Sequence, residues 1–534
     1  MSSLFRGPRE GWLSLLMLLA VVLSPAISLA NADWVADLHI TPQLAFFGVL
    51  VGVVLAKLPV RGVVSHLLAL EVGVLLVGAY FAGKAAGGEW EERMLWLWGR
   101  VWNWLQAAFG GGMSNDDMLF ALLMGLSAWM LGYLSAWFVF RQRNAWPPLV
   151  ACGSALLVNL SYATPNALSY FLVFLLASLL LLVRINLSQK ERDWHRSDAE
   201  YNRGLTWRSL VASTLLSMTV LAGAWALPIG TVNVSVAESW YSATGPWQGL
   251  QLEFDRLFAS VGSSTGKVEG NRFTKTLALK GAIELGQEMV MLVASPRPEY
   301  WAAQTYDRYT GQGWMSSADQ VTRLDSNDPR LAETSLYKGR EDVEQRFKLL
   351  VGRSYGVFAA TSPVKLSLPV YADHFSSLDE LAAVRSTIPV RQNQQYAVVS
   401  SVSVASVEEL RKAGTDYPEW AGRYLELPSN MSRRVVGQAR GLVREANNPY
   451  DAALAIQDYV RGFTYDIDVT SPPPDRDAVE WFLFTSREGY CDYFASAMAV
   501  MARSVGIPSR VVSGYNTGTF NQGTGLYEVR QENA

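Results

Sequence analysis

One cysteine near the end of the sequence lies where a nucleophile could act. Cys491 follows Gly489 and precedes apolar residues that recur at helical spacing over 494–505. The thiol would lie at a helix N-terminus, where the helix dipole and free N–H groups favour the thiolate. These N–H groups could also donate to the oxyanion formed when a thiolate attacks a carbonyl. The residues alone leave two readings of Cys491 open: a nucleophile supported by Gly489, Tyr490 and Asp492, or a structural cysteine buried as a small apolar side chain.

A thiol nucleophile also needs a base, and none follows the cysteine. The chain has 4 histidines: His39, His66, His195 and His374. The first three lie in N-terminal segments that are largely apolar, and His374 lies in a region of short strand patterns. Their spacing does not resemble that of metal ligands, so we expect neither a metal nor another cofactor.

The N-terminal part of the chain predicts a membrane domain. Residues 10–228 are largely apolar blocks, whereas 229–534 have the composition of a soluble protein. About 20 apolar residues cross a bilayer once. We predict about seven spans, near 12–30, 41–56, 63–83, 118–140, 145–162, 166–183 and 208–228. The first block could instead be a signal peptide, although the spans that follow closely favour a retained helix.

The distribution of basic residues predicts the orientation of these spans. Lys57 and Arg61 flank one short loop, Arg141 and Arg143 another, and 184–208 is rich in Lys and Arg. All three fall on the cytoplasmic side if the N-terminus is cytoplasmic. We expect a multi-pass protein of the inner (cytoplasmic) membrane with residues 229–534 outside the cytoplasm. The net charge of −3 argues against nucleic acid as a partner.

Two features of the membrane part leave alternatives open. Tryptophans cluster at 90–104, which predicts an interfacial helix on the outer surface, with a lipid or glycan site as the alternative. Glu71 lies within the third predicted span, where it would make a structural hydrogen bond, with Asn159 or a tyrosine as partner, or mark a transport path.

The soluble half reads first as a short helical lead-in and then as strands. Residues 229–262 predict the lead-in, and 273–406 contain β-branched or alternating runs between Gly, Pro, Asn and Asp. The segment QTYDRYTGQGW (304–314) predicts a hairpin whose aromatic residues pack in the core. This pattern indicates a β-rich module.

Helical patterns return from Tyr417 onward. Amphipathic helices are predicted within 429–446 and 448–466, the second with Asn448 as N-cap and Pro449 in its first turn. A short buried helix at 478–484 leads to the cysteine. We therefore predict a multi-domain chain: a membrane domain at 1–228, a lead-in and β-rich module at 229–410, and an α+β core at 411–534.

The segment GYCDYFASAMAVMARSVGIPSRVVSGY (489–515) resembles the core of the transglutaminase-like superfamily. That pattern is Gly-x-Cys, Phe-Ala, a helix, Gly-Ile-Pro-Ala-Arg and a Gly-Tyr strand end. The matching residues are Gly489, Cys491, Phe494, Ala495, Gly506, Ile507, Pro508, Arg510, Gly514 and Tyr515, with Ser509 in place of the alanine. Upstream segments resemble a narrower group, the bacterial membrane-anchored transglutaminase-like proteins with a multi-span N-terminal domain. The resemblance covers nearly the whole chain, more loosely before residue 417.

This resemblance implies a papain-like fold and a Cys-His-Asp mechanism with Cys491 as the nucleophile. The cysteine would attack a glutamine-type or peptide amide, and an amine or water would resolve the acyl-enzyme. The family's His-Ala-Trp segment and its aspartate follow the strand that here ends near 531, so the histidine is expected just after Ala534. We expect the catalytic His and Asp to be absent from these residues, the core to be truncated and incomplete, and the chain to be inactive as it stands. His374 precedes the cysteine, contrary to the family's order.

Other functions remain open at this point. A non-catalytic cell-envelope binding or scaffold protein could keep this fold without a triad, and the membrane helices could be the active part with the outer domain as a sensor. We expect the lipid bilayer and an extracytoplasmic protein or peptide substrate as partners. The sequence does not indicate the oligomeric state or the identity of the substrate.

Overall fold

The computed structural model describes most of the chain. The described residues are 11–162 except 33, 36, 86, 111 and 115, then 168–196, short stretches within 208–219 and 253–258, and 273–534 except 284, 335–337 and 353. Two compact units are present. The first comprises Met1–Asn103 and Asp117–Asn233, and the second Trp104–Asp116 and Val234–Ala534. The predicted lead-in at 229–262 lies almost wholly outside the described residues.

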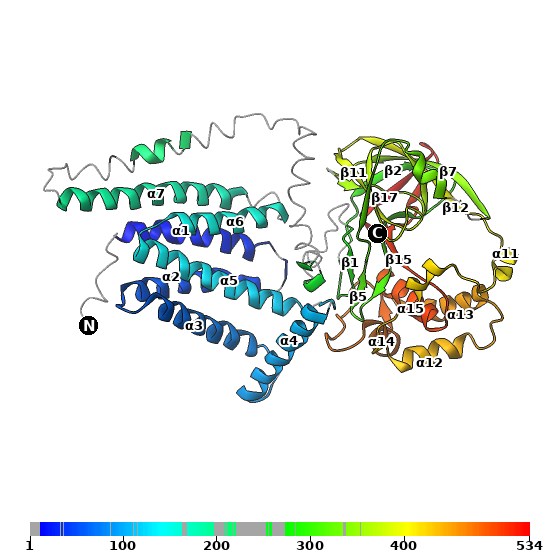
Figure 1. Cartoon of the computed structure of the whole chain (residues 1–534), viewed down its shortest axis with the longest axis horizontal. Helices are drawn as coiled ribbons and strands as arrows, with labels where there is room; N and C mark the ends of the chain where they lie inside the picture. Colours follow the sequence, from blue (N-terminus) through cyan, green and yellow to red (C-terminus); the bar gives the residue numbers. More distant parts are fainter. Residues whose placement is uncertain are drawn as a thin grey trace. The chain divides into compact units, whose positions relative to one another are not determined.

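The first unit is helical (Figure 1). Its helices are α1 (Trp12–Ala30), α2 (Thr41–Lys57), α3 (Gly62–Ala82), α4 (Trp90–Gly110), α5 (Asp117–Trp137), α6 (Trp146–Tyr162) and α7 (Leu168–Arg196), with a 3₁₀ turn η1 (Leu38–Ile40) and a π-helical turn η2 (Phe138–Gln142). Helix α4 runs on from the first unit into the second.

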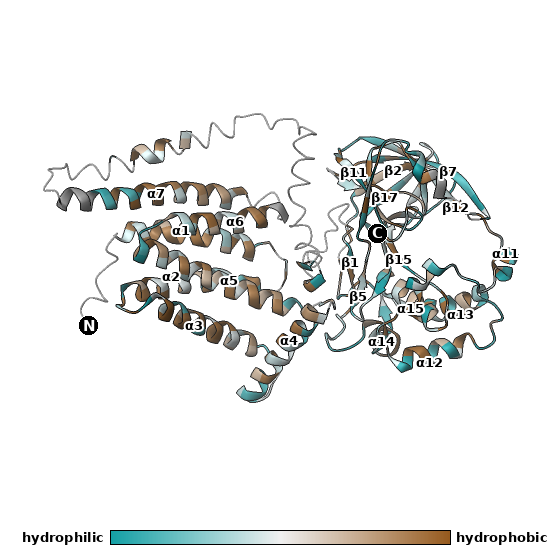
Figure 2. Cartoon of the chain, in the orientation of Figure 1, coloured by the Kyte–Doolittle hydropathy of each residue, from teal (hydrophilic) through white to brown (hydrophobic). Residues whose placement is uncertain are grey.

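Five stretches among the described residues are helices long and apolar enough to cross a membrane. They are Trp12–Ala30, Leu38–Lys57, Gly62–Ala82, Asp117–Gln142 and Leu168–Lys190. Each coincides with a predicted span, and Figure 2 shows their apolar surfaces in brown. The predicted span at 145–162 is a shorter apolar helix, Trp146–Leu160, and the span at 208–228 lies mostly outside the described residues.

Glycines let α2 and α5 pack closely. A Cβ on Gly48 would lie 2.3 Å from the carbonyl oxygen of Trp129, and one on Gly132 would lie 2.2 Å from that of Ala45. Small residues at helix contacts are how membrane helices approach each other. Glu71 is exposed on α3, and its suggested partner Asn159 donates instead to Ser28 Oγ at 2.7 Å.

The second unit contains the strands. They are β1 (Thr276–Ala278), β2 (Met289–Ala294), β3 (Trp301–Tyr306), β4 (Arg308–Tyr309), β5 (Gly313–Met315), β6 (Gln320–Leu324), β7 (Arg340–Leu349), β8 (Ser354–Gly356), β9 (Pro363–Leu366), β10 (Val370–His374), β11 (Leu381–Val390), β12 (Gln395–Ser403), β13 (Thr464–Tyr465), β14 (Glu488–Gly489), β15 (Val511–Tyr515), β16 (Thr519–Asn521) and β17 (Leu526–Arg530). The β-rich character predicted for 273–406 is confirmed.

Two sheets of this unit enclose one core. One sheet has the order β15-β3-β11-β10-β6, with β8 beside β11, and the other has β16-β17-β2-β7-β12-β9. Trp301 of β3 is buried and its ring lies 5.4 Å from that of Phe347 on β7, so side chains of the two sheets interdigitate. The sheets thus form a sandwich.

A third, smaller sheet contains the predicted hairpin. Strands β4 and β5 pair across a turn at 310–312, and β5 also pairs with β1. The N–H of Thr310 donates to Gly313 O at 2.9 Å. Gly311 has φ of 88°, which favours glycine. Tyr309 and Trp314 are buried, so the predicted core role of these aromatics is confirmed.

Helices pack against this hairpin sheet and lie together in Figure 1. They are α12 (Arg433–Leu442), α13 (Pro449–Arg461), α14 (Ala478–Trp481) and α15 (Cys491–Ser504), with a π-helical turn η6 (Phe482–Ser486). Helix α11 (Val407–Lys412) has no buried residue. The 3₁₀ turns of this unit are η4 (Pro329–Thr334), η5 (Glu419–Leu425) and η7 (Gln531–Asn533). Asn448 caps α13 by accepting from Asp451 N at 2.8 Å, and Pro449 is its first residue, as predicted.

The last strands of the chain join sheets that begin much earlier in the sequence. Strand β15 pairs antiparallel with β3, and β17 pairs antiparallel with β2. Residues of the predicted core at 411–534 therefore share both large sheets with strands of the predicted β-rich module. These pairings fix the part of the chain that follows α15.

Candidate active site around Cys491

Helix α15 places Cys491 at its first position. The preceding residue, Tyr490, is extended, with φ of −114° and ψ of −175°, and its side chain does not cap the helix. Val500 and Met501 are fully buried against the hairpin sheet and the neighbouring helices, which anchors the helix along its apolar face. At its start, the first N–H groups lack the partners that later turns have. The predicted helix and the predicted place of the thiol are confirmed.

Gly489 is required by close packing beneath the thiol. A Cβ at this position would lie 2.9 Å from Tyr493 Cβ and 3.0 Å from the ring of Phe482. Strand β14, which ends at Gly489, pairs in parallel with β13, and Gly489 O accepts from Asp466 N at 2.8 Å. The chain therefore approaches the thiol along a fixed, tightly packed path.

Two tyrosines on either side of the thiol share one acceptor. The hydroxyls of Tyr490 and Tyr493 donate to the carbonyl oxygen of Lys280 at 3.2 and 2.6 Å. Both side chains are buried. Tyr490 is thus held away from the thiol, and its hydroxyl serves to lock the start of α15 onto the segment after β1.

Two oxygens lie near the sulfur. Cys491 Sγ donates to Asp492 Oδ1 and to the carbonyl oxygen of Ala534, each at 3.8 Å. Ala534 is held there because Gln531 N donates to Glu288 O at 3.0 Å and Asn516 N donates to Asn533 O at 2.8 Å. Residues 531–534 thus bring the main chain beside the thiol.

The electrostatics around the thiol differ from those expected. Burial and the neighbouring Asp492 carboxylate raise the pKa of Cys491 to about 12, although the Asp492 N–H opposes the shift. Burial also raises the pKa of Asp492 to about 6, against the opposing charge of Lys280. The expectation that the helix N-terminus favours the thiolate is therefore not met among residues 1–534. Removal of solvent and a facing carboxylate outweigh the favourable N–H groups.

Tyr465 completes the surroundings of the thiol. It ends β13, its ring packs 5.9 Å from that of Phe494, and more than half of its side chain is exposed. Burial, with an added contribution from Cys491, raises the pKa of its hydroxyl. The sequence pattern did not single out Tyr465, because only the parallel pairing of β13 with β14 brings it to the thiol.

The described histidines make their contacts elsewhere. His374 is buried on β10, where its Nε2 interacts with Thr322 Oγ1 at 2.9 Å. In the first unit, His66 Nδ1 interacts with Tyr133 Oη at 2.8 Å, and His39 Nε2 with Tyr80 Oη at 3.4 Å. The side chain of His195 lies outside the described residues. Among the described residues, no group of three or more His, Cys, Asp or Glu could hold a metal.

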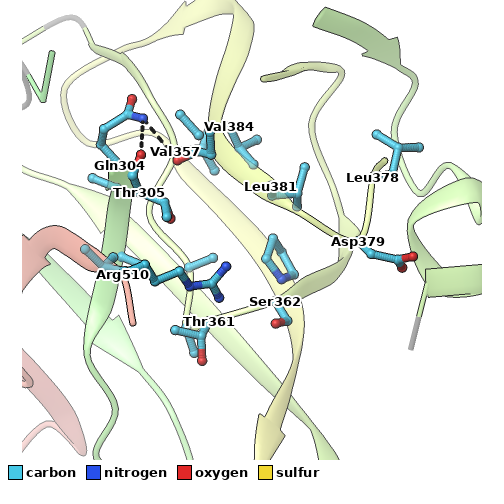
Figure 3. A pocket seen from close by; sticks show the side chains of 18 residues that line it. Gln304, Thr305, Val357, Thr361, Ser362, Leu378, Asp379, Leu381, Val384 and Arg510 are labelled. Atoms are coloured by element: carbon cyan, nitrogen blue, oxygen red, sulfur yellow. Dashed lines mark hydrogen bonds between the residues drawn. The ribbon is translucent and has the colours of Figure 1, made fainter. Parts of the chain in front are cut away.

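A separate groove lies between β3 and β11. Its volume is about 70 Å³, and alanines such as Ala302 and Ala383 line it. Figure 3 shows the side chain of Arg510 reaching into this groove on the side of Thr361. Gln304 donates its amide to the carbonyl oxygens of Thr305 and Ala382 at 3.0 and 3.3 Å. The lining residues include neither Cys nor His.

Comparison with known families gives two matches along the chain. Residues 2–406 match the family model described as TgpA N-terminal domain. Residues 437–534 match the model described as transglutaminase-like superfamily. The second match contains Cys491 and all of α15.

Two curated relatives are similar over less than half of the chain. An uncharacterized protein, YebA, of Bacillus subtilis (strain 168) is 31% identical over 258 residues, which cover 44% of this chain and 34% of the relative. A protein-glutamine gamma-glutamyltransferase of Pseudomonas aeruginosa is 27% identical over 242 residues, which cover 45% of this chain and 33% of the relative. The matched part of the chain therefore spans about a third of the length of each relative.

Crystal structures of the periplasmic domain of TgpA from Pseudomonas aeruginosa are also similar. The ethylmercury-bound form aligns over 49% of this chain and 88% of that chain, with 22% identity and a TM-score of 0.35. A second structure of the same domain aligns over 50% and 88%, with 22% identity and a TM-score of 0.37.

Proposed function

Because this chain belongs to the TgpA family, with the family's N-terminal domain at 2–406 and a transglutaminase-like core at 437–534, we propose that it is a membrane-anchored cysteine acyltransferase. The Cys491 sulfur attacks the carbonyl carbon of a glutamine-type or peptide amide. The S–C bond forms, the C–N bond breaks, and ammonia or an amine leaves with the proton. An amine or water then attacks the thioester and releases the cysteine.

The place of Cys491 is the observation that supports this proposal most directly. Its sulfur lies at the first residue of α15, where the Asp492 N–H opposes the rise in the thiol pKa that burial and the Asp492 carboxylate cause. A carbonyl oxygen attacked by that sulfur would develop its charge beside the same helix N-terminus. Asp492 N–H is the donor we assign to the oxyanion. Gly489 allows the close packing of the chain just before the thiol, and the Tyr490 side chain holds the start of α15 in place.

The base we propose is a histidine at the position that follows Ala534. Ala534 O lies 3.8 Å from Cys491 Sγ, so a histidine at the position that follows would stand within reach of the thiol. This agrees with the order implied by the resemblance to the superfamily. An imidazolium at that place would oppose the Asp492 charge and lower the thiol pKa. Residues 1–534 alone contain no histidine after His374 and are proposed to be inactive.

The proposed site of action is outside the cytoplasm. Lys57 and Arg61 lie between α2 and α3, and Arg141 and Arg143 lie between α5 and α6, so both basic loops fall on one side of the membrane. With those loops in the cytoplasm, the second unit meets extracytoplasmic proteins or peptides of the cell envelope. The inner membrane is the membrane we propose.

The decisive experiment extends the chain past Ala534. The segment that follows the matched region in the Pseudomonas aeruginosa relative is fused after Ala534, and incorporation of a labelled amine into a glutamine-containing peptide is measured. We expect the extended chain to work about 10² to 10⁴ times faster than residues 1–534, the range of general acid–base help. Alanine in place of the added histidine must remove this gain, and Cys491→Ala must abolish the reaction. Activity that persists in folded Cys491→Ala would overturn the proposal.

A non-catalytic binding protein is the second candidate. The raised pKa of Cys491 disfavours the reactive thiolate, and the groove beside Arg510 offers a surface lined by neither Cys nor His. If the extended chain gives no turnover and the thiol stays unreactive at neutral pH, while Arg510→Ala weakens binding of a carboxylate-bearing peptide, this second function replaces the first. Unchanged peptide binding in Arg510→Ala would reject the groove as its site.

A further inference from the structure

Helix α4 exposes large apolar side chains in a way that soluble surfaces avoid. Within residues 90–103, the side chains of Leu95, Trp98 and Trp102 are 70%, 60% and 51% exposed. Trp90 is 53% exposed as well. Clusters of exposed apolar residues on this scale mark interaction surfaces.

Three of these side chains share one face of the helix. Leu95, Trp98 and Trp102 are separated by three and four residues, which places them in one row along the helix. Leu97, about 200° further round, is buried against the protein. Glu92 and Asn103 lie on the remaining, polar side and are exposed. The helix therefore has a packed face, a polar face and an open apolar face.

The composition of α4 indicates that it lies along a membrane. It has 21 residues, as α3 has, yet α3 is apolar enough to cross a bilayer and α4 is not among the helices that are. Glu91, Glu92 and Arg93 stand in its first turn and Arg100 near its middle. Helices that lie in the interface plane combine charged residues with an exposed apolar face that carries tryptophan.

The chain connections keep this helix close to the bilayer. Residues 83–89 link it to the end of α3, and 111–116 link it to the start of α5. Both neighbours are long and apolar enough to be spans. A link of seven residues reaches at most about 25 Å, so α4 starts within reach of the headgroups. The open face needs no further partner than the bilayer to which the helix is tethered.

The charges beside the open face favour a neutral surface. Glu89, Glu91 and Glu92 carry three negative charges against the two positive charges of Arg93 and Arg100. Arg93 Nε donates to the carbonyl oxygens of Gly87 and Gly88, each at 3.2 Å, and Arg100 lies 5.1 Å from the ring of Trp96. This arrangement offers no basic patch for anionic headgroups.

We propose that residues 90–103 lie in the interfacial layer of a zwitterionic bilayer, with Leu95, Trp98 and Trp102 directed toward the acyl chains. Tryptophan rings prefer this layer because their N–H stays near water while the ring is apolar. The attraction is apolar, so anionic lipid adds nothing to it. This assignment is independent of the acyl-transfer reaction at Cys491.

Spin labels on the two faces test this orientation. The full chain carrying Cys152→Ser and Cys491→Ser is labelled at Leu95→Cys or at Asn103→Cys and placed in phosphatidylcholine liposomes. Collision with oxygen, which concentrates in the bilayer, and with a water-soluble nickel chelate is measured by power saturation. We expect the label at 95 to collide mainly with oxygen and the label at 103 mainly with nickel.

Three results would overturn the proposal. Equal nickel accessibility at 95 and 103 would mean that the face is in water. Shielding of the label at 95 from both reagents, or dipolar broadening between labels, would mean that protein or a second copy covers it. A marked shift on adding anionic phosphatidylglycerol, reversed by salt, would mean that the attraction is electrostatic. Unchanged accessibility with phosphatidylglycerol and salt supports the apolar assignment.

Discussion

Cys152 and Cys491, both free thiols, lie in opposite kinds of surroundings. Cys152 lies within α6, is fully buried, and has Ser135 Oγ 4.0 Å from its sulfur. Cys491 opens α15, is half-buried, and faces a carboxylate, a carbonyl and a backbone N–H. The two residues have the same chemistry in isolation. Their positions on a helix, interior or first turn, decide which can meet a substrate.

The comparison also shows that a helix N-terminus alone does not make a thiol acidic. At Cys491 the favourable N–H groups are opposed by burial and by Asp492, and the pKa rises. A further positive charge is required to reverse this balance. The start of α15 thus positions the sulfur. The positive charge that would lower the thiol pKa has to come from another part of the site.

The largest expected difference between the two thiols is their rate of alkylation. In the folded, detergent-solubilised chain at pH 9, we expect iodoacetamide to modify Cys491 at least about 100-fold faster than Cys152, because a fully buried thiol reacts only through local opening. Peptide mass spectrometry over time gives both rates. In the denatured chain the two rates should converge. Equal rates in the folded chain would contradict the contrast between the sites.

The packing beneath Cys491 predicts a loss of stability in Gly489→Ala. The added Cβ would meet Tyr493 Cβ at 2.9 Å, and overpacking of this kind costs about 1–3 kcal/mol. Thermal unfolding should shift down by several degrees, at about 2–4 °C per kcal/mol. Gly437→Ala on α12 is the matched control, since its Cβ meets open space. An unchanged midpoint in Gly489→Ala would show that the approach to the thiol is looser than described.

The raised pKa of Cys491 predicts a steep pH dependence for residues 1–534. Below its pKa of about 12, the thiolate fraction, and hence the alkylation rate, rises about tenfold per pH unit. We expect no plateau between pH 7 and 10 in the folded chain, whereas the denatured chain levels off near the ordinary thiol pKa. A plateau near pH 7 in the folded chain would show that the site already favours the thiolate.

The smallest expected effect belongs to Asp492→Asn. Removing this carboxylate lowers the thiol pKa, so alkylation at pH 8 should become about threefold faster. Because Asp492 itself has a pKa of about 6, the parent and the variant should differ above pH 6 and converge below about pH 5. Asp458→Asn removes the same charge at an exposed position of α13 and should leave the alkylation rate of Cys491 unaltered. A slower Asp492→Asn would mean that Asp492 helps ionise the thiol.

Local patterns in the sequence predict local structure well in this chain. The Asn448 cap, the turn around Gly311 and the start of α15 at Cys491 depend on neighbours within a few residues, and each is found as predicted. Gly489 is also found in the close approach expected of it. These features have short-range physical causes.

The remaining features of the site depend on contacts between distant residues. Strand β17 joins β2 and thereby brings Ala534 to the thiol. Tyr490 and Tyr493 share the carbonyl of Lys280, more than 200 positions earlier. The pKa of Cys491 follows from burial, which no helical pattern reports. The sequence therefore predicts the position of the thiol at the start of α15 but misjudges its electrostatics.

The central claim is that Cys491 forms the acyl bond. The chain extended past Ala534 is mixed with a glutamine-containing peptide, quenched in acid within the first turnover, and digested for mass spectrometry. We predict that the peptide containing Cys491 gains the mass of the substrate less one ammonia, and that the adduct is lost on treatment with hydroxylamine. An adduct on any other residue, or amine incorporation by Cys491→Ala, would contradict the account.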